Sequence, residues 1–527
     1  MNEDILKPYS GLALSGPPIG FQGTGGAGQG YLERFAHWAV NTPDAIAVRE
    51  NDSGRQYSYA EAQHEIEKMR GQFCELGVQP GDRVLLILPL GAEFVFAFYA
   101  LTSLQVVSVV LSPNLTSWEL ANCLRKLAPR GIITESRQLD THGKAFRELQ
   151  ALRFVFSVDA PASGSGLVVR TCADLHAAPM PLKPLGRANP VISCHETYKG
   201  FSSPVSVLHR YHDYSHSISG MGDSMPHPLL PGEVVLGWLP LYSVYSLTMS
   251  VLLTLSYGAT LLLVEKMRSN FLELFSSSQA RVVPMIPSML PLLLRQVEGK
   301  TVPPLHPHLY LCSGGSKLGQ GIRERVEAAL GLTLCEGYGT TETLPITGNF
   351  PGLSRPGSIG RSLVAANRIA ILDVHGQELP PGERNIGEIA VRGPSVAEGF
   401  VDDPQHAAHF FRDGWFHTGD LGWRDEDGYF YFVGRRISIT KISAQMVDLR
   451  EVEQILVSHP GVNRARTIVH ADEGECEQLI ASVMQQTGQI VDAGMLRAHC
   501  RKYLSPHKIP KRFNIYPMPA PTARVLN

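Results

Sequence analysis

The sequence lacks an excess of either charge. Its 527 residues include 47 lysines and arginines against 49 aspartates and glutamates, which leaves a formal net charge of −2. Charged residues make up 18% of the chain, below the roughly 25% that is usual in soluble domains. A near-neutral chain has no broad electrostatic attraction for nucleic acid or for acidic membranes, so we expect neither as a partner.

The sequence also lacks the paired cysteines and long apolar runs that mark other protein classes. None of its eight cysteines falls in a CxxC pair or at zinc-ligand spacing, which favours buried, reduced thiols. The stretch LTMSVLLTLSYGATLLLVE is broken by Ser, Thr, Tyr and Gly, which favours a core helix followed by a strand over a membrane span. The acidic N-terminal segment MNEDILKPYS is unlike a secretion signal. We therefore expect a cytoplasmic protein.

The chain divides into segments of different pattern, and its length predicts more than one domain. Residues 1–30 are rich in Gly and Pro, which indicates a flexible lead. In residues 31–433, apolar strands alternate with amphipathic helices, a pattern typical of an α/β fold with helix-covered, parallel-type sheets. Within this large domain, residues 362–433 have short strands with Gly turns, which predicts a β-rich subdomain. Residues 434–527 predict a small α+β domain.

Individual elements follow from the apolar periodicity and the breakers around it. We expect helices over residues 31–43 and 60–78, the second one stopped by Gly77. Strands are expected over residues 83–90 and 106–113.

Four ordered motifs resemble those of the ANL superfamily of adenylate-forming enzymes, which includes acyl-CoA ligases, peptide-synthetase adenylation domains and luciferases. Residues 336–342 (EGYGTTE) are similar to its aromatic-Gly-x-Thr-Glu motif, and residues 414–420 (GWFHTGD) are similar to its W-x-x-T-G-D motif. Residues 434–453 match the hinge motif, and residues 504–510 (LSPHKIP) match a late segment with Lys and Pro. The resemblance implies that a carboxylate is first joined to ATP, that the small mobile domain then rotates, and that the acyl group passes to a thiol, often that of coenzyme A.

The resemblance also assigns a nucleotide site. Asp420 matches the carboxylate that binds both ribose hydroxyls, and Arg435 matches an arginine that reaches the same ribose. Tyr338 matches the aromatic residue that stacks on adenine, although an ordinary core position is the alternative. The other residues expected to contact the nucleotide are Gly314, Gly339 and Glu336.

Catalytic and metal-binding roles are implied in the same way. Thr341 resembles the hydroxyl donor to the α-phosphate, and Glu342 resembles the Mg²⁺ ligand, a role that applies only if Mg-ATP is used. Lys441 matches a lysine that faces the active site in the second half-reaction, with a solvated surface lysine as the alternative.

The segment LPLYSVYSL resembles the one that lines the acyl pocket in this superfamily. Ser243 stands where the superfamily has a histidine, which predicts a pocket enlarged for a bulky acid. The residues expected to line the pocket are Tyr242, Ser243, Tyr245, Cys312 and Gly337.

The sequence departs from the superfamily pattern where phosphate would bind. The phosphate loop of the superfamily is rich in Ser, Thr and Gly, whereas residues 193–204 (SCHETYKGFSSP) retain a single glycine. Such a loop presents successive backbone N–H groups to phosphate, which requires small residues. Tyr198 and Phe201 are expected to hinder this approach and Glu196 to repel phosphate, while Lys199 still offers a charge.

Further departures lie near the C-terminus and at the hinge. The superfamily ends in P-T-G-K, but residues 521–524 are PTAR, so Arg524 replaces the lysine that bridges carboxylate and α-phosphate. Arg is forked and bulkier and does not reproduce a point charge. Ile437 and Ala444 replace a polar residue and a glycine of the hinge motif.

These departures affect the adenylation half-reaction more than the second half. We therefore hypothesise an acyl-CoA ligase-like enzyme that takes a preformed acyl-adenylate from a separate adenylating ligase, transfers the acyl group to coenzyme A and releases AMP. This resembles the non-adenylating acyl-CoA ligases of platensimycin and platencin biosynthesis, a natural-product (antibiotic) pathway. The alternatives are a complete ligase for coenzyme A or an acyl-carrier protein, which uses ATP and Mg²⁺, and a non-catalytic binder of acyl-adenylate.

Overall fold

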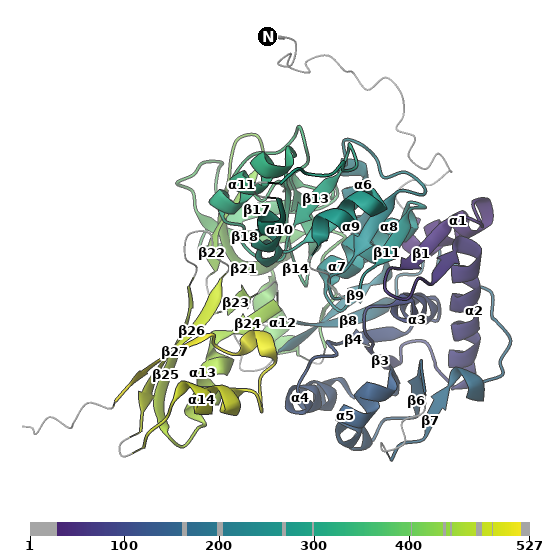
Figure 1. The fold of residues 1–527 in the computed structure, drawn as a ribbon, viewed down its shortest axis with the longest axis horizontal. Helices are drawn as coiled ribbons and strands as arrows, with labels where there is room; N and C mark the ends of the chain where they lie inside the picture. Colours follow the sequence, from purple (N-terminus) through teal and green to yellow (C-terminus); the bar gives the residue numbers. More distant parts are fainter. Residues whose placement is uncertain are drawn as a thin grey trace, which may run out of the picture.

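The computed structural model describes residues 29–517 except 161–165, 198–203, 266–269, 298–299, 402, 436–438, 443–444, 471–476 and 487–488. Residues 1–28 of the expected lead lie outside this range, as do Tyr198, Lys199, Phe201, Ile437, Ala444 and Arg524. Two large sheets with helices around them form most of the molecule, and a smaller unit from the end of the chain lies beside them (Figure 1).

The first large sheet has eight strands in the order β19-β9-β8-β4-β3-β5-β6-β7. Strands β8 to β7 of this order are parallel, whereas β9 and β19 are antiparallel. The strands are β3 (Arg83–Ile87), β4 (Val107–Val110), β5 (Gly131–Thr134), β6 (Phe154–Ser157), β7 (Val169–Thr171), β8 (Val191–Thr197), β9 (Val205–Arg210) and β19 (Gly399–Phe400).

The second large sheet has nine strands in the order β16-β15-β14-β13-β12-β10-β11-β1-β2, parallel in the middle and antiparallel at both ends. The strands are β1 (Ile46–Glu50), β2 (Gln56–Ser58), β10 (Val234–Gly237), β11 (Thr260–Leu263), β12 (Ala280–Met285), β13 (Tyr310–Ser313), β14 (Cys335–Thr340), β15 (Leu344–Gly348) and β16 (Arg361–Ser362). The parallel-type sheets expected from the sequence are therefore present, but the eight-stranded sheet has antiparallel strands at one edge and the nine-stranded sheet has them at both edges.

Helix α3 (Ala92–Ser103) contacts strands of both large sheets and is buried along almost its whole length. This explains why its sequence is apolar all round rather than on one face. The other helices of this part are α1 (Tyr31–Asn41), α2 (Tyr59–Glu75), α4 (Ser117–Leu127), α5 (Ser136–Arg147), α6 (Tyr211–Ser224), α7 (Val244–Ser246), α8 (Leu253–Ser256), α9 (Phe271–Ser278), α10 (Leu290–Val297) and α11 (Gln320–Leu330).

Local signals explain both ends of helix α2, of which the stop at Gly77 was predicted. Helix α2 begins after Ser58, which forms a capping box with Glu61, and the chain leaves it at Gly77 with φ of +79°. The expected helix and strand near residue 250 are confirmed as a π-helical turn over Leu247–Leu252, helix α8 and strand β11. Within the described part of the chain, no helix is both long and apolar enough to cross a membrane.

The rest of the chain is β-rich and then mixed. A five-stranded antiparallel sheet comprises β17 (Arg368–Leu372), β18 (Gly387–Arg392), β20 (Phe411–Arg412), β21 (Trp415–Arg424) and β22 (Phe430–Arg435), with helix α12 (Pro404–Phe410) beside it. A hairpin of β23 (Ile439–Ile442) and β24 (Gln445–Asp448) follows. The last elements are α13 (Leu449–Val457), β25 (Val462–His470), β26 (Gln478–Gln485), α14 (Ala493–Cys500), a 3₁₀ turn over Pro506–Lys508, and β27 (Arg512–Tyr516). The domain boundary expected at residues 433/434 falls inside β22 and stays a prediction.

Candidate functional site

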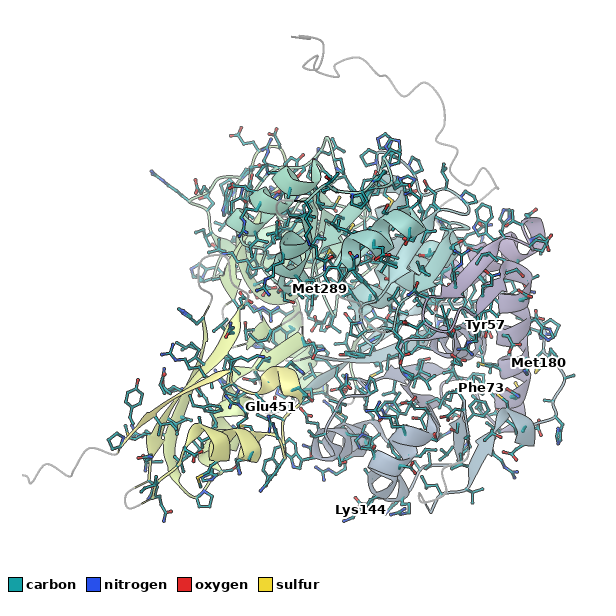
Figure 2. All side chains as sticks on the ribbon, in the orientation of Figure 1. Tyr57, Phe73, Lys144, Met180, Met289 and Glu451 are labelled. Atoms are coloured by element: carbon teal, nitrogen blue, oxygen red, sulfur yellow. The ribbon has the colours of Figure 1, made fainter. Side chains whose placement is uncertain are left out.

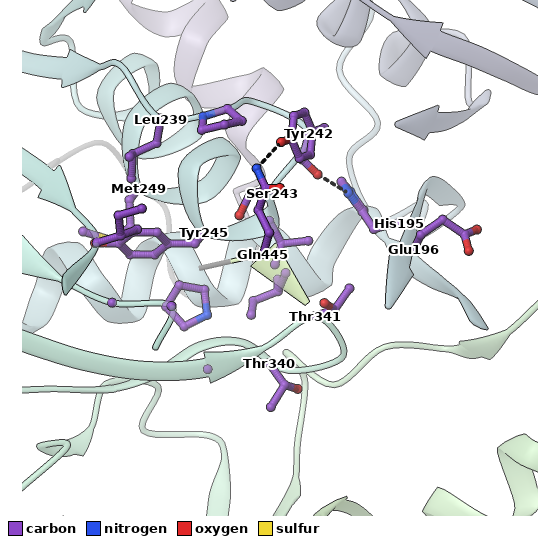
Figure 3. A pocket seen from close by; sticks show the side chains of 18 of the residues that line it. His195, Glu196, Leu239, Tyr242, Ser243, Tyr245, Met249, Thr340, Thr341 and Gln445 are labelled. Atoms are coloured by element: carbon purple, nitrogen blue, oxygen red, sulfur yellow. Dashed lines mark hydrogen bonds between the residues drawn. The ribbon is translucent and has the colours of Figure 1, made fainter. Parts of the chain in front are cut away.

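One cavity of about 500 Å³ lies where the two large sheets meet the small C-terminal unit. Its walls come from the ends of β13, β14 and β15, from the segment around residue 242, from α4 and from the small unit. Figure 3 shows Leu239, Tyr245 and Met249 on one side of this pocket and His195 and Glu196 on the other. The cavity therefore combines an apolar wall with polar groups contributed by distant segments.

Five apolar side chains that belong to one hydrophobic cluster line the cavity, and we call them its apolar end. These are Met221, Met225, Met249, Leu344 and Leu363. Methionine side chains have flexible, polarisable thioethers that adapt to different apolar shapes. This end can therefore enclose a sizeable apolar group without a rigid template.

Tyr245 lies beside the apolar end and packs against the end of strand β13. A side-chain carbon on Gly314 would lie 3.0 Å from the Tyr245 ring. The Tyr245 hydroxyl donates to the carbonyl oxygen of Cys312 at 3.3 Å. Burial holds the pKa of Tyr245 well above its ordinary value. Tyr245 is therefore a neutral wall, and the glycine allows its ring to come close to the backbone.

Strand β14 presents glycine backbone along the cavity. A side-chain carbon on Gly339 would lie 2.2 Å from the Leu344 carbonyl oxygen, and one on Gly337 would lie 3.0 Å from the Thr347 carbonyl oxygen. Both glycines line the cavity. Because glycine has no side chain, β14 can pair closely with β15, and no side chain from these two positions fills the cavity.

Tyr338 lies between these glycines and connects the cavity to a buried carboxylate. Its hydroxyl donates to Asp420 Oδ2 at 2.8 Å, and the other oxygen, Oδ1, lies 2.8 Å from Arg435 Nε. Asp420 and Arg435 face each other across β21 and β22. Asp420 is only 1% exposed and is not among the lining residues, so Tyr338 is the residue that connects it to the cavity.

Glu336 precedes Tyr338 and also lines the cavity. Burial raises the pKa of Glu336 to about 7, although the neighbouring Arg323 guanidinium opposes this shift. Arg323 Nη1 lies 3.2 Å from Glu336 Oε2 and is itself almost fully buried. The carboxyl group is therefore near its titration point at neutral pH.

His195 is a cavity residue for which the sequence analysis proposed no role. Its Nε2 lies 2.9 Å from the Tyr214 hydroxyl, and its Nδ1 lies 3.2 Å from the Tyr242 carbonyl oxygen. Burial, helped by His209, lowers the pKa of His195 to about 3. The imidazole is therefore neutral, and it supports the Tyr242 backbone rather than supplying a charge.

The segment expected to replace the phosphate loop begins as strand β8. Glu196 lies in this strand, lines the cavity and accepts a hydrogen bond from Ser206 Oγ on β9. Burial raises the pKa of Glu196. The residues that turn between β8 and β9 lie outside the described range, so the expected weak phosphate binding stays a prediction.

Gln445 brings the C-terminal hairpin to the cavity. Its Nε2 donates to the Tyr242 hydroxyl at 2.8 Å, although the two residues are 203 positions apart (Figure 3). Lys441 lies in β23 and its backbone pairs with Met446 on β24; its side chain is outside the described part. The strand that carries Lys441 is thus held next to the cavity by its hairpin partner.

Thr341 and Glu342 follow strand β14. The Thr341 carbonyl oxygen accepts a hydrogen bond from His209 Nε2 at 2.6 Å, and Thr341 lines the cavity. Glu342 is fully buried and is not among the lining residues. Among the described residues, no three His, Cys, Asp or Glu side chains converge as metal ligands.

The structure brings most of the expected site residues together. Those that line this cavity are Tyr242, Ser243, Tyr245, Cys312, Gly314, Glu336, Gly337, Tyr338, Gly339 and Thr341. Asp420 and Arg435 join them through Tyr338. The individual roles of these residues stay predictions. Gln445 and the three methionines were not predicted as site residues, because nothing local in the sequence marks them.

Comparison with protein families gives two matches along the chain. A model of AMP-binding enzymes matches residues 35–191 and 203–401, and a model of the C-terminal domain of AMP-binding enzymes matches residues 451–522. The first match leaves out residues 192–202, most of the segment in which the expected glycines are missing.

Several curated ligases are similar along nearly the whole chain. 4-Coumarate–CoA ligase 3 of Arabidopsis thaliana is 26% identical, with 90% of this chain and 86% of the relative covered. Sulfoacetate–CoA ligase of Cupriavidus necator is 27% identical, with coverage of 91% and 92%. Crotonobetaine/carnitine–CoA ligase of Escherichia fergusonii is 28% identical, with coverage of 87% and 90%.

Solved structures share the fold. A double mutant of o-succinylbenzoate CoA synthetase from Bacillus subtilis, bound with a product analogue, matches with a TM-score of 0.78 at 22% identity, covering 93% of this chain and 95% of that one. The amide bond synthetase of Marinactinospora thermotolerans also matches at 22% identity, with a TM-score of 0.78 and coverage of 93% and 96%. The α/β fold with a small C-terminal domain is therefore confirmed.

Proposed function

Because the chain belongs to the family of AMP-binding enzymes, we propose that it is an acyl-CoA ligase that forms a thioester through an acyl-adenylate. One observation carries this proposal. The apolar end, the strand segment around Tyr338 and the hairpin residue Gln445 all border the same cavity. An acyl group, its adenylate and an incoming thiol can therefore meet in one enclosed space, as proximity catalysis requires.

The lining favours an acid with an apolar, uncharged body. The five side chains of the apolar end are uncharged, and Tyr245 beside them is kept neutral by burial. Of the described cavity residues, Lys508 carries a positive charge, and it is paired with Glu119 and Glu451. A second carboxylate on the substrate would be desolvated without a cation to receive it, which is costly. Aromatic and medium-chain aliphatic acids therefore fit better than dicarboxylates.

We assign the nucleotide to the wall around Tyr338. In this proposal the Tyr338 ring stacks on adenine, Asp420 and Arg435 hold the ribose, and Thr341 donates to the α-phosphate. Gly314, Gly339 and Glu336 complete the wall. The structure of malonyl-CoA ligase, a match with a TM-score of 0.75, holds methylmalonyl-CoA and AMP, which supports AMP and coenzyme A as ligands of this chain.

Thioester formation needs few protein groups once the adenylate is present. The thiol loses its proton to solvent and its sulfur bonds to the carbonyl carbon; the bond from that carbon to the phosphate oxygen breaks, and AMP leaves with the electron pair on its phosphate. Lys441 is our proposed donor to the developing charge, on a strand whose hairpin partner already touches Tyr242. Donors fixed in advance stabilise such charge without reorganisation.

Mg²⁺ is expected with ATP, and Glu342 is the residue proposed to hold it. In this structure Glu342 is fully buried and does not line the cavity. Mg²⁺ is usually held by one or two carboxylates together with waters and the phosphates of the substrate, so a carboxylate that does not reach the cavity does not fit this role in the present arrangement.

A second candidate is an enzyme restricted to the thioester half-reaction. Glu196 favours it, because a carboxyl group lines the cavity on the segment where a phosphate loop would offer backbone donors. The PTAR ending favours it as well. A separate adenylating ligase would then supply the acyl-adenylate, as in the platensimycin and platencin type of natural-product biosynthesis. The curated relatives are named as CoA ligases and favour the complete enzyme.

Two parallel reactions separate the candidates. The first contains ATP, Mg²⁺, coenzyme A and one acid from a panel of octanoate, benzoate and 4-coumarate, with malonate as the charged contrast. The second contains the synthetic adenylate of the same acid and coenzyme A. Thioester in both supports the complete ligase, and thioester only in the second supports the restricted enzyme. Thioester in neither, across the panel, rejects both and leaves a non-catalytic binder. If malonate reacts faster than the other acids, the proposed preference for acids with an apolar, uncharged body is wrong.

A further inference from the structure

A buried ion cluster joins helix α4 to the small C-terminal unit beside the cavity. Lys508 Nζ lies 2.6 Å from Glu119 Oε1 and 3.1 Å from Glu451 Oε2. The three side chains are 3%, 4% and 7% exposed in the order Lys508, Glu119, Glu451. Figure 2 shows Glu451 at the side of the small unit that faces the rest of the molecule. All three residues line the cavity.

Hydrogen bonds at the start of helix α4 hold the Glu119 side chain, independently of its contacts with the small unit. Its Oε2 accepts hydrogen bonds from the Thr116 N–H at 3.0 Å and from Thr116 Oγ1 at 2.9 Å, which closes the capping box of α4. The same oxygen accepts from Ser505 Oγ at 2.6 Å, next to the Lys508 turn. The small unit therefore docks onto a carboxylate that is already immobile.

Contacts around the cluster extend the same interface. The Trp118 and Tyr503 rings meet edge to face with centroids 6.2 Å apart. Glu119 and Glu451 favour the charged form of Lys508, whose pKa stays above its ordinary value although burial opposes this. The ammonium therefore remains charged at neutral pH and is paired with carboxylates from two different parts of the chain.

We propose that Lys508 is a positioning residue for thioester formation: by joining Glu119 to Glu451, it holds the small unit so that Gln445 and the hairpin stay at the cavity. Without Lys508, two buried carboxylates on opposite sides of the interface would face each other and repel. Removing one partner of a buried ion cluster costs more than the intact cluster contributes, because the remaining charge is left uncompensated. The effect of Lys508 on the reaction rate rests on the proposed function, whereas its effect on the position of the hairpin does not.

The test compares Lys508→Met with Lys511→Met, a matched change at an exposed lysine on the same segment. Single-turnover thioester formation is measured from coenzyme A and the adenylate of the panel acid with the highest rate. Lys508→Met should slow this step at least tenfold, while Lys511→Met stays within twofold of the parent. Where the parent also catalyses exchange of pyrophosphate into ATP, that rate should change less than threefold in Lys508→Met. An equal loss in both half-reactions overturns the inference.

A second change tests repulsion as the cause. Adding Glu119→Gln to Lys508→Met removes one of the two facing carboxylates, and Gln still serves in a capping box. The double variant should recover at least threefold of the lost rate. A double variant as slow as Lys508→Met, or slower, contradicts the repulsion argument.

Hydrogen exchange gives a readout that does not depend on substrate. Amides of β23 and β24 should exchange at least fivefold faster in Lys508→Met than in Lys511→Met, with the strands of the eight-stranded sheet unchanged. Unchanged exchange in the hairpin overturns the inference even if activity is lost. If no panel acid reacts, the proposed function fails while this measurement still decides the positioning role.

Discussion

The Asp420 carboxylate is 1% exposed, yet the Tyr338 hydroxyl and the Arg435 guanidinium hold it directly behind the cavity wall. The motifs predicted that these three residues act together, and the structure places them in contact. The motifs did not predict that Tyr338 bonds to the carboxylate, because the two residues are 82 positions apart and belong to different sheets. A motif predicts which residues belong to a site, whereas tertiary packing determines which group a buried side chain contacts.

Asp420→Asn tests this contact in nucleotide binding. Asn keeps the shape but loses the charge that pairs with Arg435, so AMP should bind about tenfold or more weakly, equivalent to at least ~1.4 kcal/mol. Calorimetric titration with AMP measures the change. Asp427→Asn, at an exposed carboxylate paired with Arg355, is the control and should leave AMP affinity within twofold. Equal affinity in Asp420→Asn and the parent would remove Asp420 from the nucleotide site.

Glu336 predicts a pH effect on stability. Its pKa is raised from 4.5 to about 7 by burial, so between these values the folded chain binds a proton that the unfolded chain has released. The free energy of unfolding should therefore fall as pH rises through this window, by up to about 1 kcal/mol per pH unit. Glu336→Gln removes this slope. Urea unfolding at pH 5 and pH 8 should show the variant gaining stability relative to the parent at pH 8; parallel pH profiles would refute the assignment.

Strand β14 shows what periodicity predicts at the scale of an element. Apolar runs and breakers predicted α1, α2, β3 and β4 within a few residues. The glycines of β14 were predicted as ligand contacts. Their close approach to the β15 backbone is a second reason why these positions are glycine, and no local sequence pattern predicts it. The antiparallel strands at one edge of the eight-stranded sheet and at both edges of the nine-stranded sheet were not predicted either, because the direction of a neighbouring strand depends on long-range pairing.

Gly339→Ala tests the packing role of that strand. The new carbon would lie 2.2 Å from the Leu344 carbonyl oxygen, so β14 and β15 must separate, at a cost of about 1–3 kcal/mol. Gly321→Ala, where nothing lies within 4 Å of the added carbon in helix α11, should be neutral or stabilising. Denaturant unfolding compares the two variants, and equal stability would show that the strands tolerate a side chain.

At the scale of the whole molecule, the small C-terminal unit meets the large one through contacts between residues far apart in sequence. Lys508 lies 389 positions from Glu119, and Gln445 lies 203 positions from Tyr242. The late motif singled out the segment with Lys508, but the partner Glu119 carries only a helix-capping signal in the sequence. The order of the motifs thus predicted that the chain has a large and a small unit, but it did not predict which charged residues pair between them.

The most direct test of the central claim is single-turnover reaction of a preformed acyl-adenylate, from the panel of octanoate, benzoate and 4-coumarate, with coenzyme A. Enclosure of acyl group, adenylate and thiol in one cavity predicts that thioester and AMP appear together in equal amounts, with little free acid. The same cavity predicts that Tyr245→Ala, which opens the wall against Gly314, changes the preferred acid of the panel. Release of AMP with free acid and no thioester, for every acid of the panel, would contradict the account.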